Sequence, residues 1–314
     1  MTPVFLTVDT EFAWRHHAAG LDAETIYARS VEPAGVGLQH HLDLLARHDL
    51  KATFFVDPMP AMVYGLKPVA TMVEAILAAG QEVQLHLHAN WTGAVAGDRG
   101  ASFARFNLPE YDADEQLALI AGARDLLVAA GAPLPVAFRA GAYAADDRTL
   151  AALAALGFGY DSSHNGAAPA GIGLLRERIA PAERAGLVEV PVTLIEEAPG
   201  RLRPFQICAL STQEAEAALA HAAIEDHAAV TIVSHAFELA NRLGTGANAV
   251  HVRRFAGLCR TLAASRSVLQ TTHFADRPEL MTDRDDRPLA PDRLRTGWRQ
   301  AQQLWSNLVA ERAA

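Results

Sequence analysis

The chain contains little cysteine and few aromatic residues. Of its 314 residues only Cys208 and Cys259 are cysteines, and aromatic side chains make up 7%. Two cysteines without metal-type spacing argue against a disulfide framework and suit a reducing compartment. No apolar run reaches the roughly 18 residues that a membrane-spanning helix needs, so no membrane span is expected.

Basic residues are also in the minority, since 27 Lys and Arg face 36 Asp and Glu, for a net charge of −9. This balance argues against nucleic acid and anionic membranes as partners, because both favour basic faces. The segment Met1–Asp9 has neither a basic n-region nor a small-residue cleavage site, unlike a signal peptide. We therefore expect a soluble cytoplasmic protein.

Half of the residues are hydrophobic, and short β-rich runs alternate with Ala- and Leu-rich helical patterns. Such alternation predicts parallel strands joined by right-handed crossovers, and its length favours a barrel over an open sheet. The predicted fold class is α/β, a distorted, nearly closed (β/α) barrel of seven to eight parallel strands. The predicted strands are Val4–Asp9, Ala52–Val56, Glu82–His86, Val136–Arg139, Gly159–Asp161, Leu187–Val192, Ala229–Ser234 and Leu269–Phe274.

The barrel is expected to occupy residues 1–285. Residues 286–314 are expected to form a helical appendage, with the helix over Asp292–Glu311. That helix would pack either on its own barrel or on a second copy of the chain, which would make the protein a homo-oligomer.

Ionisable residues follow several predicted strands at their C-terminal ends, where parallel α/β barrels carry their chemistry. They are Asp9, His86, Arg139, Asp161 and His235. One such residue would be unremarkable, but five strands that each place an ionisable residue at the same end of the sheet indicate a functional site.

Two histidines and two acids share the geometry of a strand. His86 and His88 are two residues apart, as are Asp9 and Glu11, so each pair points to one face if its strand persists. Two converging imidazoles suit zinc, which needs about three protein ligands when one position stays open.

With these residues, the chain resembles the polysaccharide deacetylase family (NodB homology, carbohydrate esterase family 4), in a divergent branch. The resemblance covers roughly residues 4–275, and its motifs follow the family's order. They are Leu6-Thr7-Val8-Asp9-Thr10-Glu11, Ala52-Thr53-Phe54-Phe55-Val56, Gly80-Gln81-Glu82-Val83-Gln84-Leu85-His86, Phe138-Arg139-Ala140-Gly141-Ala142-Tyr143, Asp161-Ser162-Ser163 and Val233-Ser234-His235.

The chain departs from the family pattern at three places. An acid-x-acid arrangement, Asp9 and Glu11, replaces two adjacent aspartates. Asn90 stands where the second metal histidine is usual, so His88 is the substitute that geometry offers. The third motif has Ala140 and Gly141 where proline is usual.

The resemblance implies a hydrolase that removes an acetyl or related acyl group from the nitrogen of an N-acylated sugar. Glu11, His86 and His88 would hold a divalent metal, most plausibly zinc. Asp9 would act as the base, and Arg139 would keep it charged.

The resemblance also implies roles for His235, Asp161 and Tyr143. His235 would be the catalytic acid, with Asp161 orienting its ring. The backbone N–H of Tyr143 would stabilise the oxyanion. Trp91 would stack on a sugar ring, and Asn90 beside it is placed among the substrate-binding residues.

Two alternatives stay open. One is a metal-independent or non-glycan amide hydrolase of the same superfamily, acting on a small amide. The other is a catalytically degenerate barrel that only binds a ligand, which the exchange of histidine for Asn90 would suit.

Overall fold

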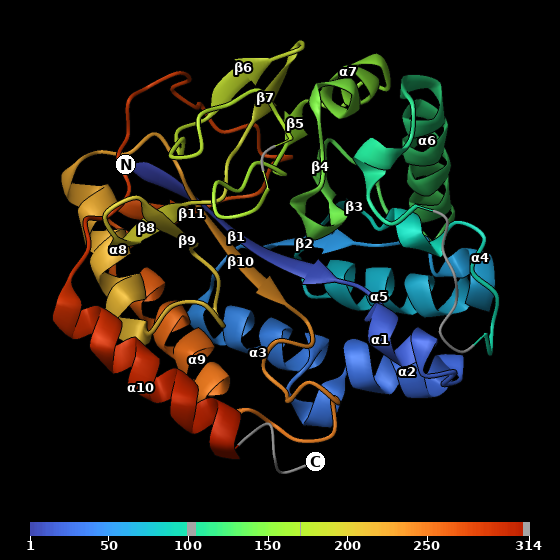
Figure 1. Cartoon of the computed structure of the whole chain (residues 1–314), viewed down its shortest axis with the longest axis horizontal. Helices are drawn as coiled ribbons and strands as arrows, with labels where there is room; N and C mark the ends of the chain where they lie inside the picture. The colour runs from blue at the N-terminus through green and yellow to red at the C-terminus, as the bar shows by residue number, and fades with distance from the viewer. Residues whose placement is uncertain (99–104, 170, 310–314) are drawn as a thin grey trace.

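The computed structural model describes residues 1–98, 105–169 and 171–309 (Figure 1). The end of the predicted appendage, residues 310–314, lies outside this range. The strands are β1 (Thr2–Thr10), β2 (Thr53–Val56), β3 (Glu82–Leu87), β4 (Ala137–Ala140), β5 (Tyr160–Asp161), β6 (Ala182–Arg184), β7 (Leu187–Glu189), β8 (Leu194–Ala198), β9 (Arg201–Pro204), β10 (Val230–His235) and β11 (Leu269–Thr271).

Ten α-helices occur among the described residues, with short 3-10 helices between them. The α-helices are α1 (Trp14–Ala18), α2 (Ala23–Ser30), α3 (Leu38–His48), α4 (Ala61–Tyr64), α5 (Lys67–Ala78), α6 (Ala113–Ala129), α7 (Asp147–Ala155), α8 (Thr212–Ile224), α9 (Ala249–Ala264) and α10 (Arg293–Val309). The 3-10 helices are η1 (Pro33–Gly35), η2 (Ala89–Trp91), η3 (Leu108–Glu110) and η4 (Gly141–Tyr143).

Capping fixes where the longer helices begin. At the start of α6 the side chain of Asp112 accepts the backbone N–H of Glu115, and Glu115 accepts the N–H of Asp112 in return. Ser211 and Glu214 form the same reciprocal box at α8. Each box satisfies N–H groups that the first helical turn leaves without a partner.

Nine strands form one curved sheet in the order β10–β1–β2–β3–β4–β5–β7–β6, and β11 pairs with the start of β1. Eight of them run parallel, as predicted, and β6 alone runs antiparallel to its neighbour β7.

The prediction of a nearly closed barrel is wrong, because the sheet is open between its end strands β6 and β10. The strand β6 turns back on β7 as a hairpin and, within the described residues, forms no ladder with β10. The segment that carries β8 and β9 covers the edge of β10 instead. Thr193 N–H donates to Thr231 O at 3.1 Å, and Ile207 N–H donates to Val233 O at 3.1 Å.

The alternation of β1 sorts its side chains between two cores. Val4, Leu6 and Val8 join the larger apolar cluster that the strands share with the surrounding helices. Phe5 belongs to a smaller cluster, where its ring stacks on Phe274 at 4.2 Å between centroids. Because alternate residues share a face, Asp9 lies on the same face as Phe5, at the C-terminal end of the strand.

The C-terminal helix α10 lies along the outside of the molecule against α8 and α9 (Figure 1). The boundary of an appendage at residue 286 stays a prediction. Within residues 1–98, 105–169 and 171–309, no helix has both the length and the apolar character to cross a bilayer.

Candidate active site

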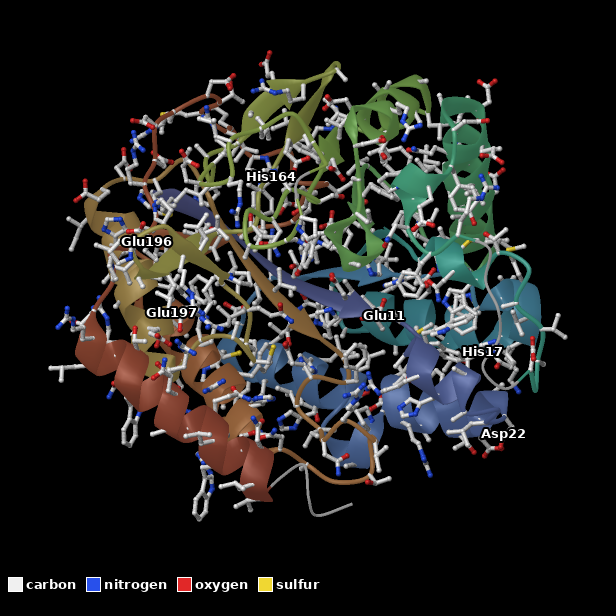
Figure 2. All side chains as sticks on the ribbon, viewed as in Figure 1. Glu11, His17, Asp22, His164, Glu196 and Glu197 are labelled. Carbon is white, nitrogen blue, oxygen red and sulfur yellow. The ribbon has the colours of Figure 1, made fainter. Side chains whose placement is uncertain are left out.

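Five neighbouring strands, β10, β1, β2, β3 and β4, bring charged side chains to one edge of the sheet. The ladder between β1 and β10 sets Asp9 beside His235, and the ladder between β3 and β4 sets His86 beside Arg139. Glu11 follows β1 at the same end (Figure 2). These parallel strands therefore bring together residues that are up to 226 positions apart in the sequence.

Glu11, His86 and His88 form the only group of at least three acidic, histidine or cysteine ligands found among the described residues. One ligand atom from each lies within 4.8 Å of the others. Oε2 of Glu11 is 3.2 Å from Nε2 of His86 and also contacts Nε2 of His88. Glu11 and His86 are buried and His88 is half-buried, so the cluster is largely shielded from water.

The tautomer of His86 follows from its second contact. Nδ1 of His86 lies 2.7 Å from the backbone carbonyl oxygen of Arg139. A carbonyl only accepts, so Nδ1 carries a proton, and Nε2 is the ring nitrogen that faces Glu11. The donor set of two imidazoles and one carboxylate fits a divalent metal.

The charges of the cluster keep the Glu11 carboxylate ionised. Although burial alone would raise the pKa of Glu11, His88 and His86 hold that pKa well below its usual range. Burial lowers the pKa of His88, but the Glu11 carboxylate outweighs it and raises the pKa of His88 to about 9. The carboxylate is thus held ionised and ready to bind a cation.

Gly141 makes room for His88. A Cβ atom at residue 141 would lie 2.5 Å from Nδ1 of His88, closer than real Cβ contacts allow. Any residue larger than glycine at this position would displace the imidazole. The histidine at residue 88 and the glycine at residue 141 are therefore sterically linked.

Asp57 and Asn90 are buried polar groups near this cluster. Asp57 was missed by the sequence reasoning, although it directly follows strand β2, and Asp9 lies at the corresponding end of strand β1. Its Oδ1 accepts the N–H of Met59 at 3.0 Å, while Oδ2 has no partner among the described residues. Burial raises the pKa of Asp57 to about 6, despite the opposing effect of His88. Asn90 is 1% exposed, and both atoms of its amide are without a hydrogen-bond partner in the described structure.

Asp9 lies between a guanidinium and an imidazole. Nη1 of Arg139 donates to Oδ1 of Asp9 at 2.7 Å, and the same nitrogen donates to Thr7 Oγ1 at 2.8 Å. Nε2 of His235 is 3.8 Å from Oδ2 of Asp9. The Arg139 and Asp9 side chains are almost completely buried, so the ion pair fixes the carboxylate in one orientation.

The carboxylate next to Nδ1 of His235 is Glu238, which the sequence reasoning did not select. Oε2 of Glu238 lies 3.9 Å from Nδ1, and the Nε2 amide of Gln206 donates to Oε1 at 2.8 Å. Burial lowers the pKa of His235, but Glu238 and Asp9 more than offset it and raise the pKa to about 9. The His235 ring is therefore an imidazolium at neutral pH.

Asp161 does not occupy the position expected for it beside His235. Its carboxylate accepts the hydroxyl of Ser163 at 2.7 Å, and Asp161 is paired in register with Glu189 on β7. The two carboxyls are buried, and burial raises the pKa of both. The expected orienting contact from Asp161 to His235 is corrected to one from Glu238. The reason is that Asp161 turns toward β7 and its partners lie there.

Tyr143 ends η4 with an unusual backbone. Ala142 and Tyr143 have φ angles of 54° and 58°, in the left-handed region that non-glycine residues rarely adopt. The hydroxyl of Tyr143 is buried without a partner among the described residues. Burial raises the pKa of that hydroxyl, so Tyr143 stays neutral.

Trp91 is not available to a sugar in this structure. The side chain is 1% exposed, because it packs edge-on against Trp14 and His17 at 5.0 Å between centroids. The predicted stacking role of Trp91 is therefore wrong for this conformation. The aromatic residue anchors α1 instead of lining the site.

The fold and the site define the class of protein: an open α/β barrel with a carboxylate–histidine cluster and a paired aspartate at the C-terminal edge of its sheet. The sequence profile of the polysaccharide deacetylase family matches residues 36–160. The family resemblance predicted from the motifs is thereby confirmed over that segment. The match supports a hydrolase that acts on the amide bonds of acetylated sugars.

The matched segment contains His86, His88 and Arg139, whereas Asp9, Glu11 and His235 lie outside it. No curated protein sequence matches the chain. A crystal structure of a candidate polysaccharide deacetylase from Mycobacterium smegmatis is 19% identical, with a TM-score of 0.54, and the match covers 91% of this chain and 94% of that one. This likeness shows a shared fold.

Two further solved structures are similar at lower scores. A family 4 carbohydrate esterase from Streptomyces lividans, in complex with acetate, is 16% identical over 93% of this chain and 98% of that one, with a TM-score of 0.42. A CE4 family pseudoenzyme from Bacillus anthracis is 12% identical over 86% of this chain and 63% of that one, with a TM-score of 0.43.

Proposed function

We propose that the chain is a metal-dependent hydrolase that removes an acetyl or related acyl group from the amide nitrogen of an N-acylated sugar. One observation carries the proposal. The Glu11–His86–His88 cluster lies at the same sheet edge as a buried Asp9–Arg139 pair and the charged ring of His235. Metal ligands, a base and an acid are the groups that metal-assisted amide hydrolysis needs.

Glu11, His86 and His88 would hold the metal, and their nitrogen and oxygen donors favour zinc. A divalent ion bound there supplies Lewis acidity, which polarises the acyl carbonyl and lowers the pKa of a coordinated water. The hydrogen bond from His86 Nδ1 to the Arg139 carbonyl would keep that imidazole in its ligating tautomer.

Asp9 would take the proton of the attacking water. Its Oδ1 is held by Arg139, while Oδ2 faces the His235 ring 3.8 Å away. The fixed orientation would leave Oδ2 as the oxygen that accepts the proton. The backbone N–H of Tyr143 would donate to the oxyanion, a contribution of about 3 kcal/mol in comparable sites.

His235 would protonate the departing amine from Nε2. Glu238 would hold the opposite nitrogen, Nδ1, and keep the ring protonated near neutral pH. This arrangement assigns the orienting role to Glu238 in place of Asp161.

A second candidate function is the hydrolysis of a small amide that is not a sugar. The burial of Trp91 favours it, because the aromatic platform expected for a sugar ring is closed. Cytoplasmic location, which stays a prediction, would also suit a small substrate or a sugar precursor over a polymer.

The proposal is tested by metal content and turnover in three variants, assayed on short N-acetylglucosamine oligomers and on small N-acyl sugars. His86→Ala should lose both bound zinc and activity. Asp9→Asn should keep its zinc and lose turnover by roughly 100- to 10,000-fold, because only the base is removed. The control His48→Ala, at the end of α3, should match the wild type in both measurements.

Other outcomes separate the alternatives. Full turnover in protein stripped of metal would overturn metal dependence. Bound zinc together with no hydrolysis of any N-acyl sugar, and with full hydrolysis of a small amide, would select the second candidate. Sugar binding without turnover would identify a degenerate barrel.

A further inference from the structure

The C-terminal helix α10 is attached to the barrel by its polar side. Arg299 is 5% exposed, and its guanidinium donates to Glu197 at 2.7 Å and to Glu214 at 3.1 Å. About two turns further on, Ser306 accepts the amide of Asn248 at 2.8 Å. Figure 2 shows Glu197 in the region where the β8–β9 hairpin approaches α10. Buried charge pairs and hydrogen bonds fix the rotation of the helix about its axis.

This rotation turns the apolar side of α10 to the solvent. Leu294 is 86% exposed, Trp298 is 52% exposed, Trp305 is 62% exposed and Leu308 is 54% exposed, and Ala301 lies between the two tryptophans. An amphipathic helix on a globular protein normally does the opposite and buries this side. Two of the four tryptophans of the chain, Trp298 and Trp305, therefore lie on this exposed surface.

The residue types of the exposed stripe follow the same order in both directions. Its members Leu294, Trp298, Ala301, Trp305 and Leu308 are alternately four and three residues apart, so they follow one face of the helix. In order they read Leu, Trp, Ala, Trp, Leu, which is the same sequence in both directions. A two-fold interface pairs a surface with the same surface of a second copy, and this order lets the stripe face its own copy in the antiparallel direction.

We propose that α10 pairs antiparallel with α10 of a second copy of the chain, about a two-fold axis near Ala301. Gly297 and Ala301 are small and let the two helices approach closely at the axis. Each Trp298 then lies near Trp305 of the second copy, and each Leu294 lies near Leu308.

The size of the stripe suits a dimer. The exposed parts of its tryptophans and leucines, with the flanking Leu304 and Val309, amount to on the order of 600 Å² per helix. Pairing two such surfaces would remove roughly 1,200 Å² from water, which is the lower limit for a specific interface.

Charge favours the antiparallel arrangement. Arg293 is exposed at the start of α10, and the described helix contains no acidic residue. Antiparallel pairing would place each Arg293 near the negative C-terminal end of the other helix, whereas parallel pairing would place the two arginines together. A lipid surface fits less well. The other exposed polar positions, Gln300 and Asn307, are uncharged, and membrane-surface helices are rich in Lys and Arg there.

Molar mass in solution tests the proposal on the full chain. Light scattering at micromolar concentration should give twice the chain mass for the wild type. The double variant Trp298→Glu with Trp305→Glu should give half of that value, with unchanged circular dichroism. Gln300→Glu, at an exposed polar position of the same helix outside the stripe, also adds negative charge and should remain dimeric. A monomeric wild type, or a dimer that survives the double variant, would overturn the proposal.

Cross-linking tests the axis itself. Ala301→Cys should form a disulfide-linked dimer on mild oxidation, because the two copies of residue 301 meet there. Asn307→Cys, on the side of the helix, should stay unlinked beyond the wild-type background. Equal cross-linking of both variants would rule out this axis. Binding of the monomeric wild type to anionic vesicles, lost in the double tryptophan variant, would assign the stripe to a lipid surface and reject the dimer.

Discussion

The protonation of His235 depends on which carboxylate lies beside Nδ1. Glu238 lies 3.9 Å from this nitrogen and the Nε2 amide of Gln206 lies 3.4 Å from it, while Asp9 and Glu11 add negative charge around the ring. His41 on α3 contacts the neighbouring Ser234. The pKa of His235 is raised to about 9, so the ring is charged below that pH and neutral above it. A catalytic acid with this pKa would keep its proton throughout the neutral range.

Replacing Glu238 should therefore narrow the pH range of the enzyme from the alkaline side. In Glu238→Gln we expect the pKa of His235 to fall by roughly one to two units, because an opposite charge is removed while the hydrogen-bonding shape is kept. Activity should then decline at correspondingly lower pH. An NMR titration of the His235 ring measures the same shift without any substrate, so it holds even if the proposed reaction is wrong.

The matched control is Asp161→Asn, which removes the other carboxylate considered for this role. Its carboxyl contacts Ser163 and faces Glu189, so the His235 titration should stay where it is in the wild type. A shift of equal size in Asp161→Asn would restore the orienting role to Asp161.

Sequence reasoning selected the site residues on the strands and directly after them, but it missed Glu238, which a later turn positions. Asp9 and His86 lie near the C-terminal ends of two buried strands, and the parallel direction of the strands is enough to bring them to one edge of the sheet. Glu238 lies in the turn three residues after His235, and no strand pattern predicts which way a turn directs its side chain. Trp91 was misread because the residues that cover it, on α1, belong to a short helix without a periodic signal.

Between β5 and β7, two buried carboxyls lie opposite each other in adjacent strands. Asp161 is paired in register with Glu189, and burial raises the pKa of both, so the pair holds a proton that the unfolded chain would release. Between the ordinary pKa values of the two carboxyls in the unfolded chain and their raised values in the folded protein, the folded state binds more protons than the unfolded state. The free energy of unfolding must therefore fall as the pH rises through this range.

Glu189→Gln should remove most of this pH dependence. The amide oxygen can still accept the N–H of His164, now 2.9 Å from Glu189 Oε1, and the amide N–H₂ can donate to Asp161. We expect the variant to exceed the wild type by about 1 kcal/mol or more at pH 8 and to differ little at pH 5. Urea unfolding at both pH values measures this. Glu183→Gln, on the exposed face of β6, is the control, and a variant with the wild-type slope would show that the two carboxyls do not share a proton.

The strands that the sequence predicted best are the ones buried on both faces. β1, β2, β3 and β10 fall within one or two residues of the predicted runs, because apolar side chains cover them from both sides. β6, β8 and β9 were missed, since they are short and partly exposed and carry charged residues such as Arg201.

The alternation of strands and helices predicts a parallel sheet, but it does not predict whether that sheet closes. Closure would require β6 to pair with β10, and β6 instead forms a hairpin with β7. The edge of β10 is covered by residues around β9, which contribute single bridges and not a ladder. Whether the sheet closes depends on contacts between segments that are far apart in the chain. The hydrophobic periodicity of the sequence carries no information about such contacts.

Zinc binding should stabilise the whole barrel, because its proposed ligands join two interior strands of the sheet. Glu11 follows β1 and His86 lies on β3, with β2 between them. Free zinc at about 100 times its dissociation constant would add about 2.7 kcal/mol to the free energy of unfolding. Differential scanning fluorimetry should then show a rise in Tm of several degrees that a chelator reverses. The rise should be absent in His86→Ala and retained in Glu189→Gln, whose substitution lies away from the cluster. If His86→Ala shows the same rise as the wild type, the ion that stabilises the fold binds elsewhere, and the assignment of Glu11, His86 and His88 as the metal site is wrong.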